Sequence, residues 1–246
     1  RNITERQAAI KLLGLLKDED SIDLLIKSLN SQNEKIRRLS YRALLKIIES
    51  DSLEKIIQAL SSKKWQIRKW CANILFKKMS DNNQEIFINH LFSLLEDPKS
   101  NVRQKAINLL SKIDNPKIVE RVRGILDRTS NWKRRRSCIQ LLTKKGGEDT
   151  LKLLFEFIDD EDFYIRNWVL QAIGRLKDLE NIEPIITLLD AEDERIKLSA
   201  IKTLSKIGDK RALPSLIRQM GETNWEIRKA AENALDKIDP SWMDIL

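Results

Sequence analysis

Apolar and polar side chains return to the same places in this chain about every 31 residues. Eight copies of one short motif end on a basic residue, and these end residues are Arg6, Arg37, Arg68, Arg103, Arg135, Arg166, Lys197 and Arg228. The spacings from Arg6 onward are 31, 31, 35, 32, 31, 31 and 31 residues. A fixed period of this length indicates a repeat array, in which each unit packs on its neighbours.

Each copy marks the start of a helix. The residue four before the basic residue is Asn or Asp in six of the eight copies, and these side chains cap helix N-termini. If the basic residue is position 0, apolar side chains recur at positions −1, +3, +6, +7 and +10, which form one helical stripe. A shorter amphipathic stretch follows each of the first seven copies, from Ile22–Leu29 to Leu213–Met220. The pattern predicts an all-α fold of about 7.5 helical hairpins in a single domain over residues 1–246.

The repeated motif resembles a known family. The pattern Asn/Asp-x-x-Ile/Val-Arg-x-x-Ala, followed by Leu and by Gly or Ile-Asp, resembles HEAT-like repeats of the short bilin-lyase type, and Asn224–Leu235 is the nearest copy. The resemblance covers essentially the whole chain and implies a right-handed α-α superhelix. Such repeats serve lyases, chaperones, adaptors and nucleic-acid binders, so a bilin-lyase-like or chaperone role stays open.

Composition limits the setting of the chain. A hydrophobic content of 41% with 33% charged residues is typical of a folded protein. No apolar stretch approaches the roughly 18 residues that span a bilayer, and no signal peptide is recognisable. Since the chain opens at Arg1, we expect a segment of a longer protein. Two cysteines without a secretory signal indicate a cytoplasmic protein.

Residues for catalysis or metal binding are few. His90 is the only histidine, which excludes a histidine-rich metal site. Cys71 and Cys138 both fall at position +3, which other copies fill with small residues, so we expect packing roles and no disulfide between them. Gly146-Gly147 is interpreted as a turn between helices. We therefore predict a non-enzymatic protein with no catalytic residues, cofactor or metal.

The formal net charge of +8 is concentrated near the middle of the chain. Residues 117–147 hold ten bases and two acids, and the remainder holds 35 bases and 35 acids. Arg134 occupies position −1, where six other copies have Ile or Val. Candidate binding residues in this basic segment are Trp132, Lys133, Arg134, Arg136 and Lys144, and nucleic-acid binding through the segment is an alternative function.

The repeated basic residue itself is assigned to structure. By their resemblance to HEAT-like repeats, Arg6, Arg37, Arg68, Arg103, Arg166 and Arg228 are expected to bridge neighbouring units through cap carboxylates and carbonyl groups.

A polar strip is predicted at positions +1 and +5, which the resemblance places on the concave side. Position +5 contains neither an acid nor an apolar residue in eight copies. Amides and bases can bind an extended peptide backbone, an acidic partner or phosphates. The strip adds Arg38, Arg42, Lys69, Asn73, Asn108, Gln140 and Gln171 to the candidates. We predict a binding scaffold for an acidic or extended protein partner.

Overall fold

The computed structural model describes residues 2–49, 52–176 and 182–245, and every regular element within these ranges is a helix. The chain divides into unit 1, over Arg1–Asp114, and unit 2, over Asn115–Leu246. The single domain expected over residues 1–246 stays a prediction.

The helix boundaries follow the predicted period. Unit 1 contains α1 (Ile3–Leu16), η1 (Glu19–Ser21), α2 (Ile22–Ser28), α3 (Glu34–Ile47), α4 (Leu53–Ala59), α5 (Trp65–Lys77), α6 (Gln84–Ser93), η3 (Leu94–Glu96) and α7 (Ser100–Leu110). Unit 2 contains α8 (Lys117–Arg128), α9 (Trp132–Lys145), α10 (Glu148–Glu156), α11 (Phe163–Leu176), α12 (Glu183–Ile186), η4 (Thr187–Asp190), α13 (Glu194–Ile207), η5 (Lys210–Ala212), α14 (Leu213–Arg218), η6 (Gln219–Gly221), α15 (Trp225–Ile238) and η7 (Trp242–Ile245).

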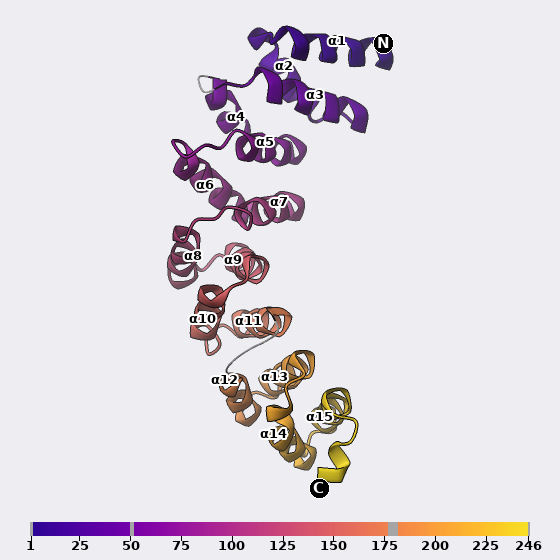
Figure 1. The fold of residues 1–246 in the computed structure, drawn as a ribbon, viewed down its shortest axis with the longest axis vertical. Coiled ribbons are helices and arrows are strands. Elements are labelled where there is room, and N and C mark those ends of the chain that lie inside the picture. Colours follow the sequence, from indigo (N-terminus) through magenta and orange to yellow (C-terminus); the bar gives the residue numbers. More distant parts are fainter. Residues whose placement is uncertain (1, 50–51, 177–181, 246) are drawn as a thin grey trace. The chain divides into compact units, whose positions relative to one another are not determined.

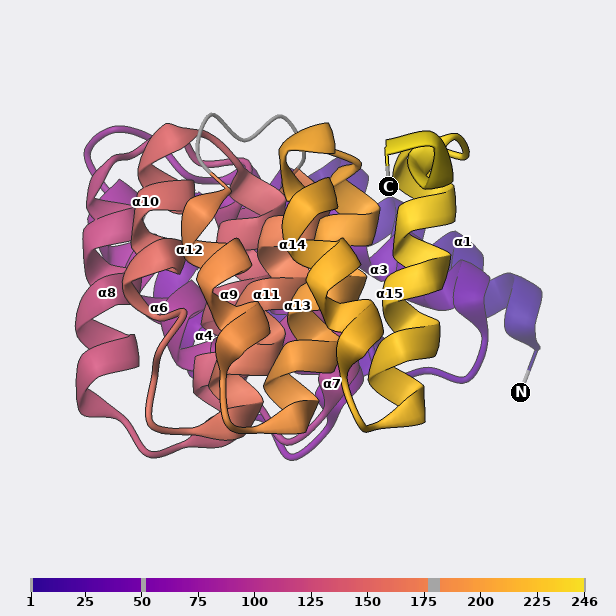
Figure 2. The same cartoon turned by 90° about the horizontal axis from the view of Figure 1, so that it is seen from below.

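In each unit the longer and the shorter helices form separate layers (Figure 1). The longer helices α1, α3, α5 and α7 pack in succession in unit 1, and α9, α11, α13 and α15 do so in unit 2. A shorter helix packs against the longer helix that follows it, as α14 does against α15 (Figure 2). Each unit is therefore a stack of helical hairpins, and the predicted α-α solenoid is confirmed.

The predicted caps and loops are present. Asn2, Asn33, Asn131, Asp193 and Asn224 each accept a backbone N–H of the first helical turn that follows. The four-residue excess in the period lies in α6, which has 10 residues where α2 and α4 have 7, so the extra residues lengthen the shorter helix of that hairpin. Gly146 and Gly147 join α9 to α10 with φ of 67° and 88°, values that favour glycine.

The predicted stripe of apolar positions forms the core. At position +3 the side chains with 0% exposure are Ser40, Cys71, Ala106, Cys138, Val169, Ala200 and Ala231. Ala9, at the same position of α1, is exposed because α1 has a longer helix on one side only. Both cysteines are free thiols with packing roles, as predicted, and burial raises the pKa of each to about 12.

A buried aspartate links successive hairpins in unit 1. Arg68 on α5 donates to both carboxylate oxygens of Asp97, at 2.6 and 2.8 Å, and to the Ser62 carbonyl at 2.6 Å. The Asp97 carboxylate also accepts the Lys99 backbone N–H, and its carbonyl accepts from Arg103. One side chain thus connects the helix of one hairpin to the loop that enters the next.

Asp160 has the same role in unit 2. Its carboxylate is paired with Arg135 of α9 and accepts the Asp162 backbone N–H, while its carbonyl accepts from Arg166. Asp97 and Asp160 both stand six residues before the next repeated arginine, two residues earlier than the cap that we expected to supply the carboxylate. Further contacts of the repeated arginines, which support their structural assignment, are those of Arg6 with Ser28, Arg37 with Ser31 and Gln32, and Arg228 with Glu222 and Thr223.

Candidate binding groove

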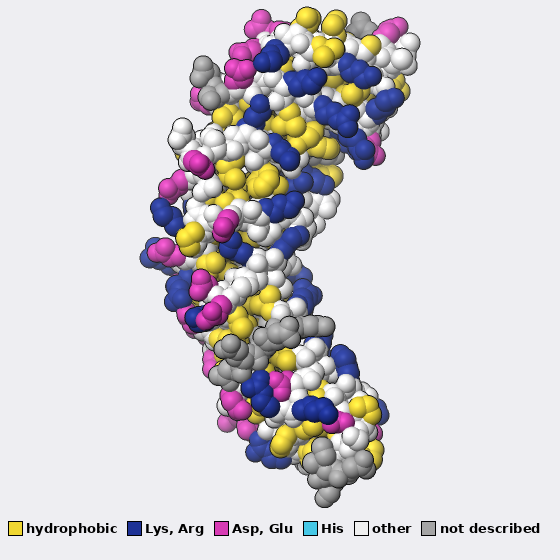
Figure 3. All heavy atoms as spheres, viewed as in Figure 1, with side chains coloured by type: hydrophobic (Ala, Val, Ile, Leu, Met, Phe, Trp, Pro, Cys, Tyr) yellow, Lys and Arg dark blue, Asp and Glu magenta, His cyan; other side chains and the backbone are white. Residues whose placement is uncertain are grey.

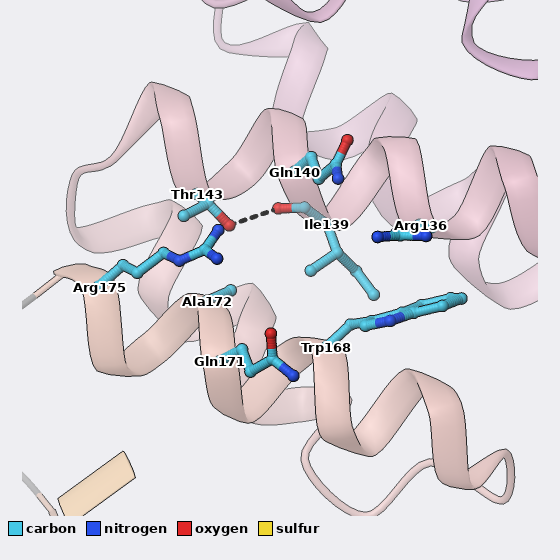
Figure 4. A pocket seen from close by; sticks show the side chains of 8 residues that line it. All are labelled: Arg136, Ile139, Gln140, Thr143, Trp168, Gln171, Ala172 and Arg175. Atoms are coloured by element: carbon cyan, nitrogen blue, oxygen red, sulfur yellow. Dashed lines mark hydrogen bonds between the residues drawn. The ribbon is translucent and has the colours of Figure 1, made fainter. Parts of the chain in front are cut away.

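A groove between α9 and α11 brings together three of the predicted binding residues, Arg136, Gln140 and Gln171 (Figure 4). The full lining is Arg136, Ile139, Gln140, Thr143, Trp168, Gln171, Ala172 and Arg175. No acidic side chain is among these eight. The groove is therefore a polar and basic surface with one aromatic wall.

Arg136 is stacked on the aromatic wall. Its guanidinium carbon lies 5.2 Å from the centroid of the Trp168 ring, and Figure 4 shows the two groups face to face. The Tyr164 ring lies 6.2 Å from that of Trp168. Attraction between the cation and the ring holds Arg136 in place without neutralising its charge. The charge stays available to an anionic ligand.

Two glutamines contribute carboxamides to the same groove. Gln140 and Gln171 are half-buried, and within the described part of the chain neither carboxamide has a hydrogen-bond partner. The hydroxyl of Thr143 donates to the Ile139 carbonyl at 2.7 Å, and Arg175 extends from α11 toward it (Figure 4). The groove thus presents donors and acceptors that a ligand can use.

The groove continues onto α13. A second hollow shares Gln171 and is lined in addition by Asn167, Arg195, Leu198, Ser199, Lys202, Thr203 and Lys206. Ser199 donates to the Asn167 carboxamide at 2.7 Å, so that amide is already engaged. We call the joined surface on α9, α11 and α13 the unit 2 groove.

Unit 1 has a different groove, between α3 and α5. Arg38 and Lys69, both predicted binding residues, line it together with Trp65 and Trp70. Here an acid is present, because Glu34 also lines the groove and forms an ion pair with Arg38 at 2.6 Å. The Lys69 ammonium lies 5.8 Å from the Trp65 ring centroid. Part of the positive charge in this groove is therefore neutralised locally.

Asn73, predicted for the same strip, is engaged inside unit 1. Its carboxamide donates to the Tyr41 hydroxyl at 2.8 Å and accepts from Lys105 at 3.3 Å. Burial, together with the nearby charges of Lys69 and Lys112, lowers the pKa of Lys105. A ligand would have to replace these bonds before it could use Asn73.

The remaining predicted residues do not line the unit 2 groove. Arg42 is exposed on α3, and Asn108 on α7 accepts from Gln104 at 3.3 Å. Figure 3 shows basic side chains gathered over α3 and α5. The predicted binding residues of α9 that lie outside the groove lining are Trp132, Lys133, Arg134 and Lys144.

Trp132 and Lys133 form a separate feature at the start of α9. Trp132 is 51% exposed, and the Lys133 ammonium lies 5.6 Å from its ring centroid. Arg134 is half-buried at position −1, where Ile165 in the next copy is fully buried. Trp132, Lys133 and Arg134 lie outside the unit 2 groove, and their role in binding a partner stays a prediction.

Residues 117–147 offer less positive charge to a ligand than their composition suggests. Arg123 pairs with Glu156 at 2.6 Å, and Arg135 pairs with Asp160, so acids outside residues 117–147 neutralise the charges of these two arginines. The rest of the chain has equal numbers of bases and acids, but its two ends have net charges of opposite sign. Residues 1–116 contain 21 bases and 14 acids, whereas residues 148–246 contain 14 bases and 21 acids.

Sequence reasoning missed the residues at position +9 other than Lys144, which was a candidate only as part of the basic segment. This position is Lys or Arg in seven of eight copies, and all seven side chains are exposed: Lys46, Lys77, Lys112, Lys144, Arg175, Lys206 and Lys237. Positions +1, +5 and +9 lie one above another on a helix and together contain no acid in any copy. Extending the strip by one turn would have identified Arg175 and Lys206 as groove residues.

Among the described residues, no group of three or more His, Cys, Asp or Glu side chains could hold a metal ion. No helix in the described ranges is both long and apolar enough to cross a membrane.

Comparison with known proteins identifies the repeats. A family model of HEAT repeats matches residues 1–75, 53–143, 119–181 and 151–236. No curated protein matches the sequence significantly. Among solved structures, Escherichia coli YibA is 25% identical, with a TM-score of 0.49 over 100% of this chain and 91% of that one.

Two solved structures of the karyopherin Kap121p are also similar. One is 15% identical, with a TM-score of 0.55 over 92% of this chain and 30% of that one. The other, bound to the extreme C-terminus of the protein phosphatase Cdc14p, is 13% identical, with a TM-score of 0.55 over 89% and 29%. This chain therefore spans less than a third of Kap121p, and the likeness shows the fold.

Proposed function

Because this chain belongs to the HEAT-repeat family, we propose that it is a protein-binding scaffold whose unit 2 groove holds an acidic, extended segment of a partner. Binding is the whole of the proposed role, without catalysis, and the proposed setting is the cytoplasm. The bound Kap121p structure gives an example of this fold holding the terminal segment of another protein.

One observation carries the proposal. Arg136 is fixed on Trp168, and Gln140, Gln171 and Arg175 surround it with no acid in the lining. A carboxylate of the ligand can pair with a guanidinium, and the carboxamides can bond its backbone. Because Arg136 is held before binding, less side-chain entropy is lost when the ligand arrives.

Charge reversal tests the groove directly. Arg136→Glu should weaken binding of a fluorescent, unstructured Asp/Glu-rich peptide by about tenfold or more in an anisotropy titration. Arg136 is exposed, so the melting temperature should stay near that of the wild type. Lys152→Glu on α10 makes the same charge change outside the groove and serves as the control. Equal losses in the control and in Arg136→Glu would show that only net charge matters.

A second candidate function is nucleic-acid binding at the start of α9. The exposed Trp132 beside Lys133 favours it, since an aromatic ring can stack on a base while nearby cations contact phosphates. Contacts to six or more phosphates should weaken binding roughly 10³–10⁵-fold between 50 and 200 mM salt. A labelled single-stranded oligonucleotide that fails to bind at the lower salt concentration would exclude this function.

A further inference from the structure

We infer that the unit 2 groove selects a polyproline II segment that carries an acidic residue at every third position. The inference rests on the proposed function, because it specifies the partner segment that the groove would bind. Its starting point is the spacing of the exposed cations at position +9, of which Arg175 and Lys206 line the groove and Lys237 lies on α15, beside α13.

Arg175, Lys206 and Lys237 form a row across unit 2. Each occupies position +9 of a longer helix, and α11, α13 and α15 pack in succession. All three side chains are exposed, and no ion pair holds them within the described ranges. Helices packed in this way are about 8–10 Å apart, so a ligand that crosses them meets one cation at about that interval.

A polyproline II segment matches this interval. It has three residues per turn and rises 3.1 Å per residue, so every third side chain lies on one side at intervals of about 9 Å. In a β-strand, side chains on one face are about 6.6 Å apart, and this spacing no longer matches the interval between the helices after one repeat. The spacing of position +9 thus favours the polyproline II conformation over a strand.

An α-helix is the other conformation whose side chains have a suitable spacing, and the free carboxamides of the groove argue against it. Acids at every seventh residue of an α-helix are about 10.5 Å apart, which is close to the interval between the helices. A helix, however, satisfies its backbone groups internally, whereas a polyproline II backbone is open to hydrogen bonds. Gln140 and Gln171 are half-buried and without partners within the described chain, so they can bond such a backbone.

The aromatic wall supports the same conformation. Trp168 lines the groove with Arg136 over its indole, and the exposed Tyr164 ring lies 6.2 Å from the Trp168 ring. Grooves lined by aromatic rings bind preformed, proline-rich segments, because the rings pack against the flat pyrrolidine faces and little chain entropy is lost. The partner segment should therefore combine proline with Glu or Asp.

Three peptides test the inference. Two have identical composition, rich in Pro and Glu, with Glu at every third position in one and in a shuffled order in the other. The third is helical, with Glu at every seventh position. Titration against the whole chain should show the first peptide binding about tenfold more tightly than either of the others, a difference of about 1.4 kcal/mol.

The possible outcomes separate the inference from the proposed function. Equal binding of the periodic and shuffled peptides, or tighter binding of the helical one, would overturn the inference and leave an acidic-segment groove in place. Failure of all three peptides to bind would remove the proposed function as well.

A variant set tests the row of cations itself. The triple variant Arg175→Gln, Lys206→Gln, Lys237→Gln should lose the tenfold preference for the periodic peptide while its melting curve stays unchanged. The matched triple variant Lys152→Gln, Lys210→Gln, Arg218→Gln removes the same charge from α10, η5 and α14 and should keep the preference. A preference that survives in the first variant would show that these side chains do not set the spacing.

Discussion

Units 1 and 2 carry the same repeat position, +5, and use it in opposite ways. In unit 1 the Asn73 carboxamide is bound by Tyr41 and Lys105. In unit 2 the carboxamides of Gln140 and Gln171 have no partner within the described residues and line a groove. A periodic pattern therefore identifies the face of a helix, whereas neighbouring side chains decide whether a group on that face is free to bind a ligand.

The largest expected effect concerns a feature that the two units share. Asp97→Ala leaves Arg68 without its buried partner, and Asp160→Ala does the same to Arg135, so each should lower the free energy of unfolding by about 3–5 kcal/mol. Urea denaturation followed by circular dichroism measures this. Glu49→Ala breaks the exposed pair with Lys17 and should cost less than about 1 kcal/mol. If the three variants lost similar amounts, the buried pairs would not be structural links.

The second prediction tests the contrast at position +5. Asn73→Ala should lower the free energy of unfolding by about 1–2 kcal/mol, because it removes two hydrogen bonds, one of them from an ammonium group. Gln171→Ala should change stability by less than about 0.5 kcal/mol and weaken acidic-peptide binding several-fold. Thermal melts and anisotropy titrations on both variants give the comparison. The contrast would disappear if Asn73→Ala impaired binding as much as Gln171→Ala.

The smallest expected effect is a pH dependence confined to unit 1. The pKa of Lys105 is lowered by burial and by Lys69 and Lys112. Its charge therefore opposes folding at neutral pH. This cost is relieved as the pH rises through the lowered pKa toward 10.5, the ordinary value of lysine. Over that window the stability of the wild type should rise relative to that of Lys105→Met, as measured by urea denaturation at several pH values. A constant difference would show that Lys105 titrates as an ordinary lysine.

Much of the fold could be predicted because each hairpin has to bury the same apolar positions against its neighbours. Ile67, Ile165 and Ile227 occupy one position of the motif and are all buried, as the apolar stripe requires. The groove was harder to predict. The strip at +1 and +5 includes Arg136 and Gln171, but Trp168, which holds Arg136, comes from the adjacent helix and from position +2.

The limits of sequence reasoning are also visible at single residues. The pairing of Arg68 with Asp97 joins side chains 29 positions apart, and no local pattern shows it. Arg175 was missed because position +9 resembles the ordinary placement of bases in the last turn of a helix, where they complement its dipole.

One cysteine lies in each unit, Cys71 in unit 1 and Cys138 in unit 2. The rate at which each thiol reacts can therefore report the local opening of its own unit. With a pKa near 12, neither Cys71 nor Cys138 has appreciable thiolate while it is buried, so an alkylating reagent reacts only when the surrounding hairpins open. The rate at each sulfur then records how often that half opens, in one sample and without any added label. Mass spectrometry of the alkylated peptides would show whether Asp97→Ala accelerates opening around Cys71 alone or around both thiols. Acceleration at Cys71 alone would mean that the two units unfold locally and independently of each other.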